Sequence, residues 1–112
     1  MKEVNNMSII KITIMNEDKQ AAYNLLGYSF QPADAEKATI LTINTSVSSI
    51  KYRIWADDNV KDINNIKSFI SSQFEDALLN NKTIFLKEEP SRNYLYFGND
   101  NTSSKMFSGS KL

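Results

Sequence analysis

The strongest periodic pattern in the sequence runs from Asp58 to Asn80 and predicts one long amphipathic helix. Apolar residues recur there at intervals of three and four positions, the spacing that brings side chains to one face of an α-helix. These residues are Val60, Ile63, Ile66, Phe69, Ile70, Phe74, Ala77 and Leu78. Polar residues fill the positions between them. The pattern is therefore typical of a helix with one face in the core and the other in water.

Alternation of apolar and polar residues with a period of two predicts strands elsewhere in the chain. The expected strands cover residues 8–14, 38–45, 50–56, 82–87 and 93–97. The short connection between the second and third of these strands predicts an antiparallel hairpin.

A second, shorter helix is expected directly after the first strand. Asn16 is a favourable N-cap residue, and Glu17 and Asp18 would stabilise the first turn through the helix dipole. Leu25 belongs to an apolar stripe of helical spacing, and Gly27 stands where such a helix would end.

The order of these elements predicts an α+β fold. Strand, helix, strand, strand, helix and strand follow one another as in a ferredoxin-like β-α-β-β-α-β fold, here with an extra C-terminal strand. Right-handed crossovers would place both helices on one face of an antiparallel sheet. A chain of 112 residues fits one domain. We therefore expect a single α+β domain over residues 8–98, with a flexible N-terminus (1–7) and a flexible polar tail (99–112).

Such a sheet would leave its second face open, and the alternation predicts what that face displays. Inward-facing positions carry Ile10, Ile12, Ile14, Leu41, Ile43, Ile50, Tyr52, Ile54, Ile84, Leu86, Leu95 and Phe97. Their neighbours would form an open face with four cations, four aromatic side chains and no carboxylate. The candidate partner-binding residues are Lys11, Lys51, Arg53, Trp55, Phe85, Lys87, Tyr94 and Tyr96.

The sequence lacks the residues on which most enzymatic sites depend. It contains no cysteine and no histidine, which excludes Ser-His-Asp and Cys-His catalytic groups and zinc sites of ordinary composition. Its 3 glycines do not form a phosphate-binding loop. The acidic pairs Asp57-Asp58, Asp34/Glu36 and Glu88-Glu89 lie at an expected helix start, in a loop and in a turn. We therefore expect a protein that is not an enzyme and that has no cofactor and no metal site.

Two functions compete for the open face. The first is a small protein-binding module, such as a phage or mobile-element inhibitor or regulator of a host protein, because tyrosine, tryptophan and arginine dominate interface hot spots. Its partner would be a different protein or a second copy in a homodimer. The alternative is single-stranded nucleic acid, with bases stacked on Trp55, Tyr94 and Tyr96. The 13 basic and 13 acidic residues balance, which favours protein. No apolar run is long enough to span a membrane, so a cytoplasmic location is expected.

Overall fold

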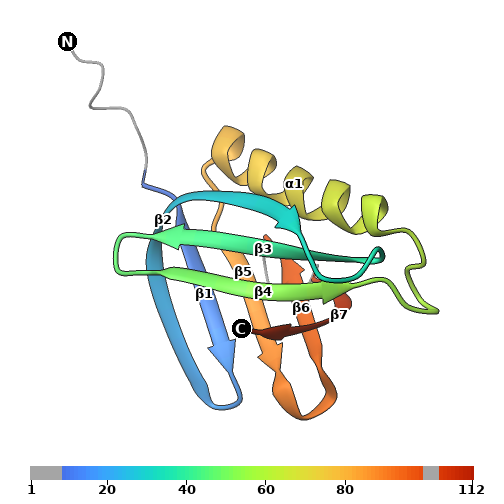
Figure 1. Cartoon of the computed structure of the whole chain (residues 1–112). Helices are drawn as coiled ribbons and strands as arrows, with labels where there is room; N and C mark the ends of the chain where they lie inside the picture. Colours follow the sequence, from blue (N-terminus) through green and yellow to red (C-terminus); the bar gives the residue numbers. More distant parts are fainter. Residues whose placement is uncertain (1–8, 100–103) are drawn as a thin grey trace.

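A computed structural model describes residues 9–99 and 104–112, and these form a closed β-barrel with one helix packed on it (Figure 1). The elements are β1 (Lys11–Asn16), β2 (Lys19–Pro32), β3 (Ala38–Thr45), β4 (Ser49–Trp55), α1 (Ile63–Asn80), β5 (Ile84–Glu89), β6 (Tyr94–Gly98) and β7 (Lys105–Lys111). Around the barrel the strands lie in the order β1-β2-β3-β4-β7-β6-β5. Neighbouring strands are antiparallel except β1 and β5, which are parallel and complete the closure.

The predicted ferredoxin-like α+β fold with two helices on one sheet face is wrong. The segment after Asn16, expected to be a helix, forms strand β2, and Glu17 adopts a left-handed conformation (φ 56°) in the turn that leads into it. The side chains of Tyr23, Leu25, Tyr28 and Phe30 pack against the core. The register of β2 against β3 shifts between Leu25 and Gly27. This β-bulge interrupts the period of two and leaves apolar residues at spacings that resemble those of a helix.

The expected flexible tail is also not what the structure contains. Residues 105–111 form β7, which pairs with β4 on one side and with β6 on the other. Most of its side chains are polar. Main-chain hydrogen bonds to β4 and β6, rather than a row of apolar side chains, hold the strand in place. Only Phe107 among its large side chains is buried in the core. The predicted flexible N-terminus (1–7) and residues 100–103 lie outside the described residues.

The predicted inward alternation is confirmed inside the barrel. Every side chain of the expected inward set is buried except Ile50, which is half-buried. Because the sheet closes on itself, these side chains fill the barrel interior, and the alternate set points outward around the barrel. The predicted open sheet face therefore does not exist as a flat surface.

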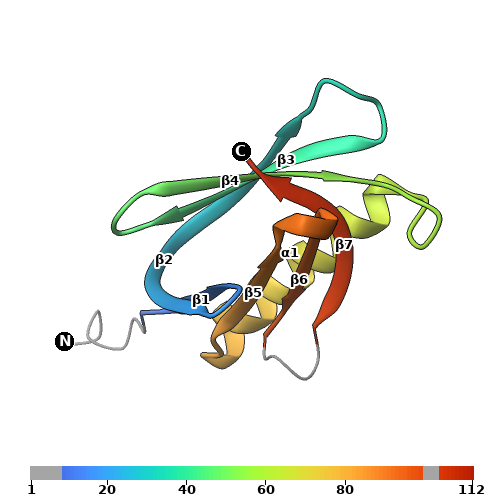
Figure 2. The ribbon, with the colours of Figure 1, turned by 90° about the horizontal axis from the view of Figure 1, so that it is seen from below.

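Helix α1 covers one end of the barrel. The Asp62 side chain caps it by accepting a hydrogen bond from the backbone of Asn64, so it begins later than Asp58. Its buried side chains are Ile66, Ile70, Phe74 and Ala77. The ring of Phe74 stacks on Tyr28, with centroids 4.1 Å apart, and lies 5.3 Å from Phe97. The β1–β2 and β5–β6 turns lie at the opposite end (Figure 1), and Figure 2 shows them from below with α1 behind the strands.

Replacing Phe74 by alanine should destabilise the fold by about 3–5 kcal/mol, because it removes a fully buried ring and leaves a cavity between helix and barrel. Urea denaturation measures this difference. The matched control is Leu79→Ala on the same helix, where the side chain is 83% exposed and a change within about 0.5 kcal/mol is expected. Equal effects of the two substitutions would contradict the packing of α1.

Gly109→Ala tests whether β7 is part of the barrel. An added Cβ would lie 2.7 Å from Leu95 Cδ1 and 2.9 Å from the Arg53 carbonyl oxygen, so we expect a loss of about 1–3 kcal/mol from overpacking. Gly27→Ala is the control, since no atom beyond the two adjacent residues lies within 4 Å of its added Cβ. Thermal melts compare the two. A flexible tail would tolerate Gly109→Ala as readily as Gly27→Ala.

Candidate functional site

Six of the eight predicted partner-binding residues point outward from one side of the barrel, on β4, β6 and β5. We call these six residues the outer strip: Arg53, Trp55, Phe85, Lys87, Tyr94 and Tyr96. Trp55 on β4 and Tyr94 on β6 both pair with Ser108, and Tyr96 pairs with Lys87 on β5. Paired residues point to the same side of a sheet, so the strip runs across β4, β7, β6 and β5.

The other two predicted residues are not part of this strip. Lys11 lies on β1, beyond Phe85, and its ammonium group donates a hydrogen bond to Asn24. Lys51 lies at the other end of β4 from Trp55 and pairs with Thr42. Phe85 belongs to the strip by register but is only 9% exposed, so it contributes little surface.

Two cations of the outer strip lie over its aromatic rings. The Arg53 guanidinium carbon is 5.2 Å from the centre of the Trp55 ring, and the Lys87 ammonium is 5.2 Å from that of Tyr96. Cation–π contacts of this length hold both partners in a defined orientation. Tyr96 also donates its hydroxyl to Glu89, at 2.8 Å. The strip is therefore a preorganised set of large amphipathic side chains.

Three carboxylates border the outer strip, although the sequence analysis placed none on this face. Asp34 binds Arg53 (Nε–Oδ1 3.0 Å), Asp57 accepts a hydrogen bond from Ser108, and Glu89 accepts one from Tyr96. The hydrogen bond from Arg53 lowers the pKa of Asp34, and that from Ser108 lowers the pKa of Asp57. Both carboxylates stay ionised at neutral pH, so negative charge balances the cations of the strip.

A second group of polar residues lies inside the barrel, at the end opposite α1. Glu88 on β5 points inward and is 4% exposed. Its Oε2 accepts a hydrogen bond of 2.5 Å from the Tyr52 hydroxyl, and its Oε1 accepts one of 2.6 Å from Asn16 Nδ2. Burial, followed by this bond to Glu88, raises the pKa of Tyr52 far above its ordinary value. Sequence reasoning assigned Glu88 to a turn, although Ile84, Leu86 and Glu88 continue the same inward alternation.

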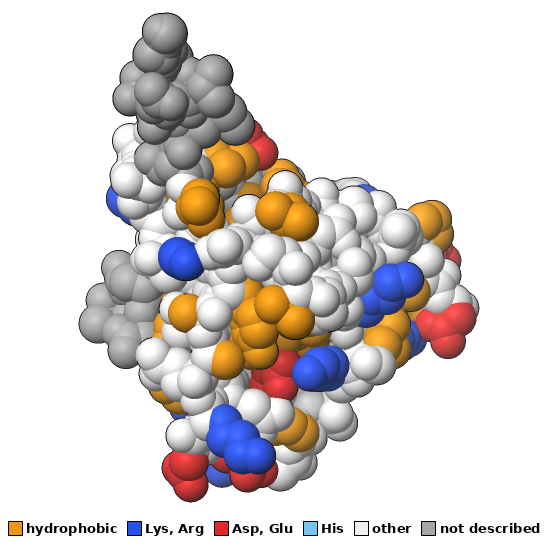
Figure 3. All heavy atoms as spheres, turned by 90° about the vertical axis from the view of Figure 1, so that its left-hand side faces the viewer, with side chains coloured by type: hydrophobic (Ala, Val, Ile, Leu, Met, Phe, Trp, Pro, Cys, Tyr) orange, Lys and Arg blue, Asp and Glu red, His pale blue; other side chains and the backbone are white. Residues whose placement is uncertain are grey.

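Two hollows meet at this carboxylate. The larger, of about 490 Å³, is lined by residues of the β1–β2 hairpin together with Ile50, Glu88 and Lys111. The smaller, of about 270 Å³, is lined by Asn16, Glu88 and residues of β6 and β7. Figure 3 views the side on which the β1–β2 hairpin and the β3–β4 turn lie, where hydrophobic side chains gather beside acidic and basic ones. We call the larger hollow the barrel mouth.

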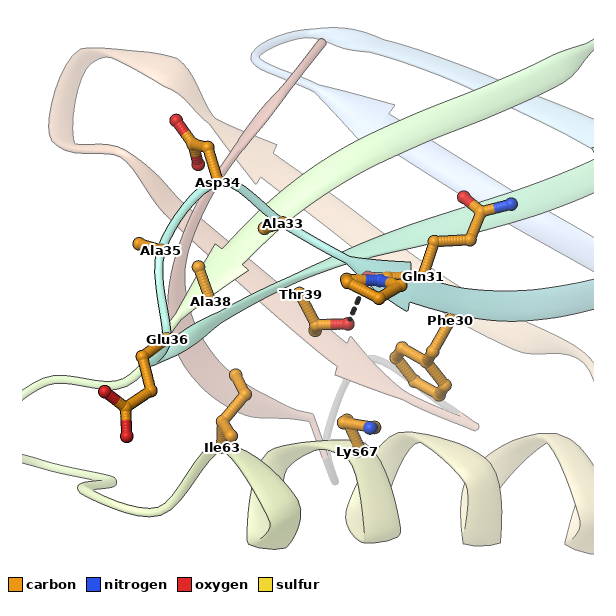
Figure 4. A pocket seen from close by; sticks show the side chains of 11 residues that line it. Phe30, Gln31, Ala33, Asp34, Ala35, Glu36, Ala38, Thr39, Ile63 and Lys67 are labelled. Atoms are coloured by element: carbon orange, nitrogen blue, oxygen red, sulfur yellow. Dashed lines mark hydrogen bonds between the residues drawn. The ribbon is translucent and has the colours of Figure 1, made fainter.

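A further hollow of about 430 Å³ lies between α1 and the loop after β2 (Figure 4). Phe30, Ile63 and Lys67 line it, and Thr39 uses its hydroxyl to bind the backbone oxygen of Gln31 (3.0 Å). The side chains of Asp34 and Glu36 point away from the hollow in Figure 4. No polar groups converge in this hollow, and we assign it no binding role.

Apolar side chains also gather where β1, β2 and the end of α1 meet. Ile9, Leu26 and Leu78 line a hollow of about 390 Å³ there. Leu78 is 57% exposed, although its spacing placed it in the buried stripe of the helix. We call these three residues the apolar patch.

Within residues 9–99 and 104–112, acidic side chains do not gather in groups of three that would hold a metal ion. The same residues contain no helix with the length and hydrophobicity needed to cross a bilayer. No protein-family model, curated protein or solved structure matches this chain.

Tyr52→Phe should destabilise the protein by about 1–3 kcal/mol at neutral pH, because it removes one of the two hydrogen bonds to the buried carboxylate. Tyr96→Phe, which removes a half-buried surface hydroxyl, is the control and should change stability by less than about 0.5 kcal/mol. Urea denaturation compares the two variants with the parent.

The hydrogen bond between Tyr52 and Glu88 should also make the free energy of unfolding depend on pH. Because the folded-state pKa of Tyr52 is raised, its contribution to stability is fully present below about pH 10 and is lost above it, where the unfolded chain releases the proton first. Above pH 10, the free energy of unfolding of the parent should fall by up to about 1.4 kcal/mol per pH unit more than that of Tyr52→Phe. Parallel curves would contradict the burial of this hydroxyl.

Proposed function

We propose that the protein is a small non-enzymatic binding module that recognises a protein partner through the outer strip. The observation that carries this proposal is the arrangement of Trp55 on β4 and of Tyr94 and Tyr96 on β6, on either side of β7, with Arg53 held between Trp55 and Asp34. Large aromatic side chains and arginine account for most of the binding energy at protein interfaces. Their rigid placement reduces the side-chain entropy that binding costs.

The charge distribution around the strip supports protein over single-stranded nucleic acid. Bases stack readily on exposed tyrosine and tryptophan, but the backbone needs cations that are free to track phosphates. Here Arg53 is paired with Asp34, and two further carboxylates, Asp57 and Glu89, border the same strands. Ionised carboxylates repel phosphates, so nucleic acid remains the weaker alternative.

The proposal covers two kinds of protein partner. A different protein and a second copy of this chain would use the same aromatic side chains. The inference that the partner is a host protein regulated by a phage or mobile-element product rests on composition alone and stays a prediction, as does a cytoplasmic location.

Site-specific photo-crosslinking in the native host tests the surface. A photoreactive phenylalanine derivative at position 96 should crosslink a partner, because Tyr96 lies within the proposed contact. The matched position is 78, on the apolar patch and away from the strip. A partner captured from position 78 and not from position 96 would contradict the proposal and assign the interface to the apolar patch. A crosslinked homodimer would identify the partner as a second copy.

With the captured partner purified, Trp55→Ala should weaken binding by about 30-fold or more, as expected for a central aromatic anchor. Lys61→Ala, a change of an exposed residue before α1, should leave the affinity unchanged. Titration calorimetry measures both variants. Micromolar binding of a thymidine oligonucleotide at about 0.15 M salt, lost in the double variant Arg53→Ala, Lys87→Ala, would instead establish the nucleic-acid alternative.

A further inference from the structure

The buried carboxylate at the barrel mouth has unused hydrogen-bonding capacity. An ionised carboxylate accepts about four hydrogen bonds, and Glu88 receives one on each oxygen from Tyr52 and Asn16. Both donors are neutral. Among the residues that the structure describes, no ion pair includes Glu88. A buried carboxylate without a cation is costly, and a bound positive group would relieve that cost.

The walls of the barrel mouth suit the stem of such a ligand. Ile14, Ala21 and Ile50 provide apolar surface, and Tyr23 provides an aromatic ring beside them. Aliphatic carbons are favoured against such surface, and an aromatic ring also attracts a cation. Glu88 belongs to the same lining, so the hollow combines a buried carboxylate with apolar wall residues.

We infer that the barrel mouth binds an organic cation, a primary ammonium or guanidinium group on a short alkyl stem, which donates hydrogen bonds to Glu88. A free amine and a lysine or arginine side chain of a peptide share this chemistry. A metal ion fits less well, because Glu88 is the sole carboxylate in the lining of the hollow. The inference does not depend on the outer strip, whose residues do not line this hollow.

Two lysines in the lining of the barrel mouth lead to the opposite expectation, that the hollow binds an anion. Lys19 and Lys111 are both exposed and belong to the rim. If these cations dominated the field at the mouth, the hollow would prefer an anion. The buried position of Glu88 favours the opposite, because charges interact more strongly where water is excluded than at an exposed rim.

Nitrogen-15 NMR titration of the full chain at pH 7 with butylammonium chloride tests the inference. Butylammonium should shift the amide signals of Asn16, Glu88 and Ile50 with a dissociation constant of about 1–10 mM, as expected for so small a ligand. The matched probes are 1-butanol, which is neutral, and butanoate, which is anionic. Both should bind at least about tenfold more weakly. Comparison of Nα-acetyl-lysine amide, which keeps its side-chain ammonium, with butylammonium then distinguishes a peptide side chain from a free amine.

Glu88→Gln is the decisive variant, because it keeps the shape of the side chain and removes its charge. It should weaken butylammonium binding by about 10- to 100-fold. Lys111→Ala should preserve or strengthen binding. Ile50→Trp fills the hollow from a half-buried position and should abolish binding with Glu88 intact, which keeps the test valid if Glu88→Gln fails to fold.

Four results would overturn the inference. The first two are equal shifts with 1-butanol and tighter binding of butanoate. The others are butylammonium binding that Glu88→Gln or Ile50→Trp leaves unchanged, and the absence of any shift with butylammonium at tens of millimolar. None of these results bears on the outer strip, because the crosslinking experiment uses a different surface.

Discussion

Main-chain pairing of β7 with both β4 and β6 is the interaction on which the rest of this structure depends. Without it, β4 and β6 would each present an unpaired edge, and the two halves of the sheet would not enclose a common interior. The strand is held by its backbone and by the close approach of Gly109 to Leu95 and the Arg53 carbonyl. Closure separates side chains that point into the barrel from side chains that point out of it. The outer strip belongs to the outward set, and Glu88 at the barrel mouth belongs to the inward set.

Closure also gives the two ends of the barrel different roles. At one end α1 supplies apolar side chains, and the stacking of Phe74 on Tyr28 joins the helix to β2. At the other end, among the residues that the structure describes, no α-helix covers the interior, and the inward position of β5 carries Glu88 in place of a further apolar residue. Its hydrogen bond with Tyr52 connects β5 with β4 across the barrel, and its bond with Asn16 reinforces the pairing of β5 with its neighbour β1. The polar end is thus both a structural link and the floor of the barrel mouth.

Elements that follow a regular period could be predicted from the sequence, and elements that break it could not. Helix α1, the β3–β4 hairpin and the inward residues of β1, β5 and β6 follow their periods. The bulge between Leu25 and Gly27 gives the apolar residues of β2 a spacing that resembles that of a helix. Strand β7 has too few apolar residues to be predicted as a strand. These two errors add a second helix and leave the predicted sheet two strands short of the seven that close the barrel. For the outer strip, alternation placed the aromatic residues correctly, but Asp34 and Asp57 come from loops whose paths no periodic pattern predicts.

The parallel pairing of β1 with β5 has a consequence for how the chain reaches this structure. Ile12 pairs with Ile84, and Tyr52 with Lys111, so two of the ladders that close the barrel join segments far apart in the sequence. Contacts of this kind carry a large loop-closure entropy and are formed slowly. The β3–β4 hairpin, the β6–β7 pair and α1 are local, so we expect them to form early, whereas the edges of β4 and β7 stay unpaired until they meet. During that interval they can pair with the same strands of another chain, so we expect strand exchange between copies to be the main route of misfolding for this topology.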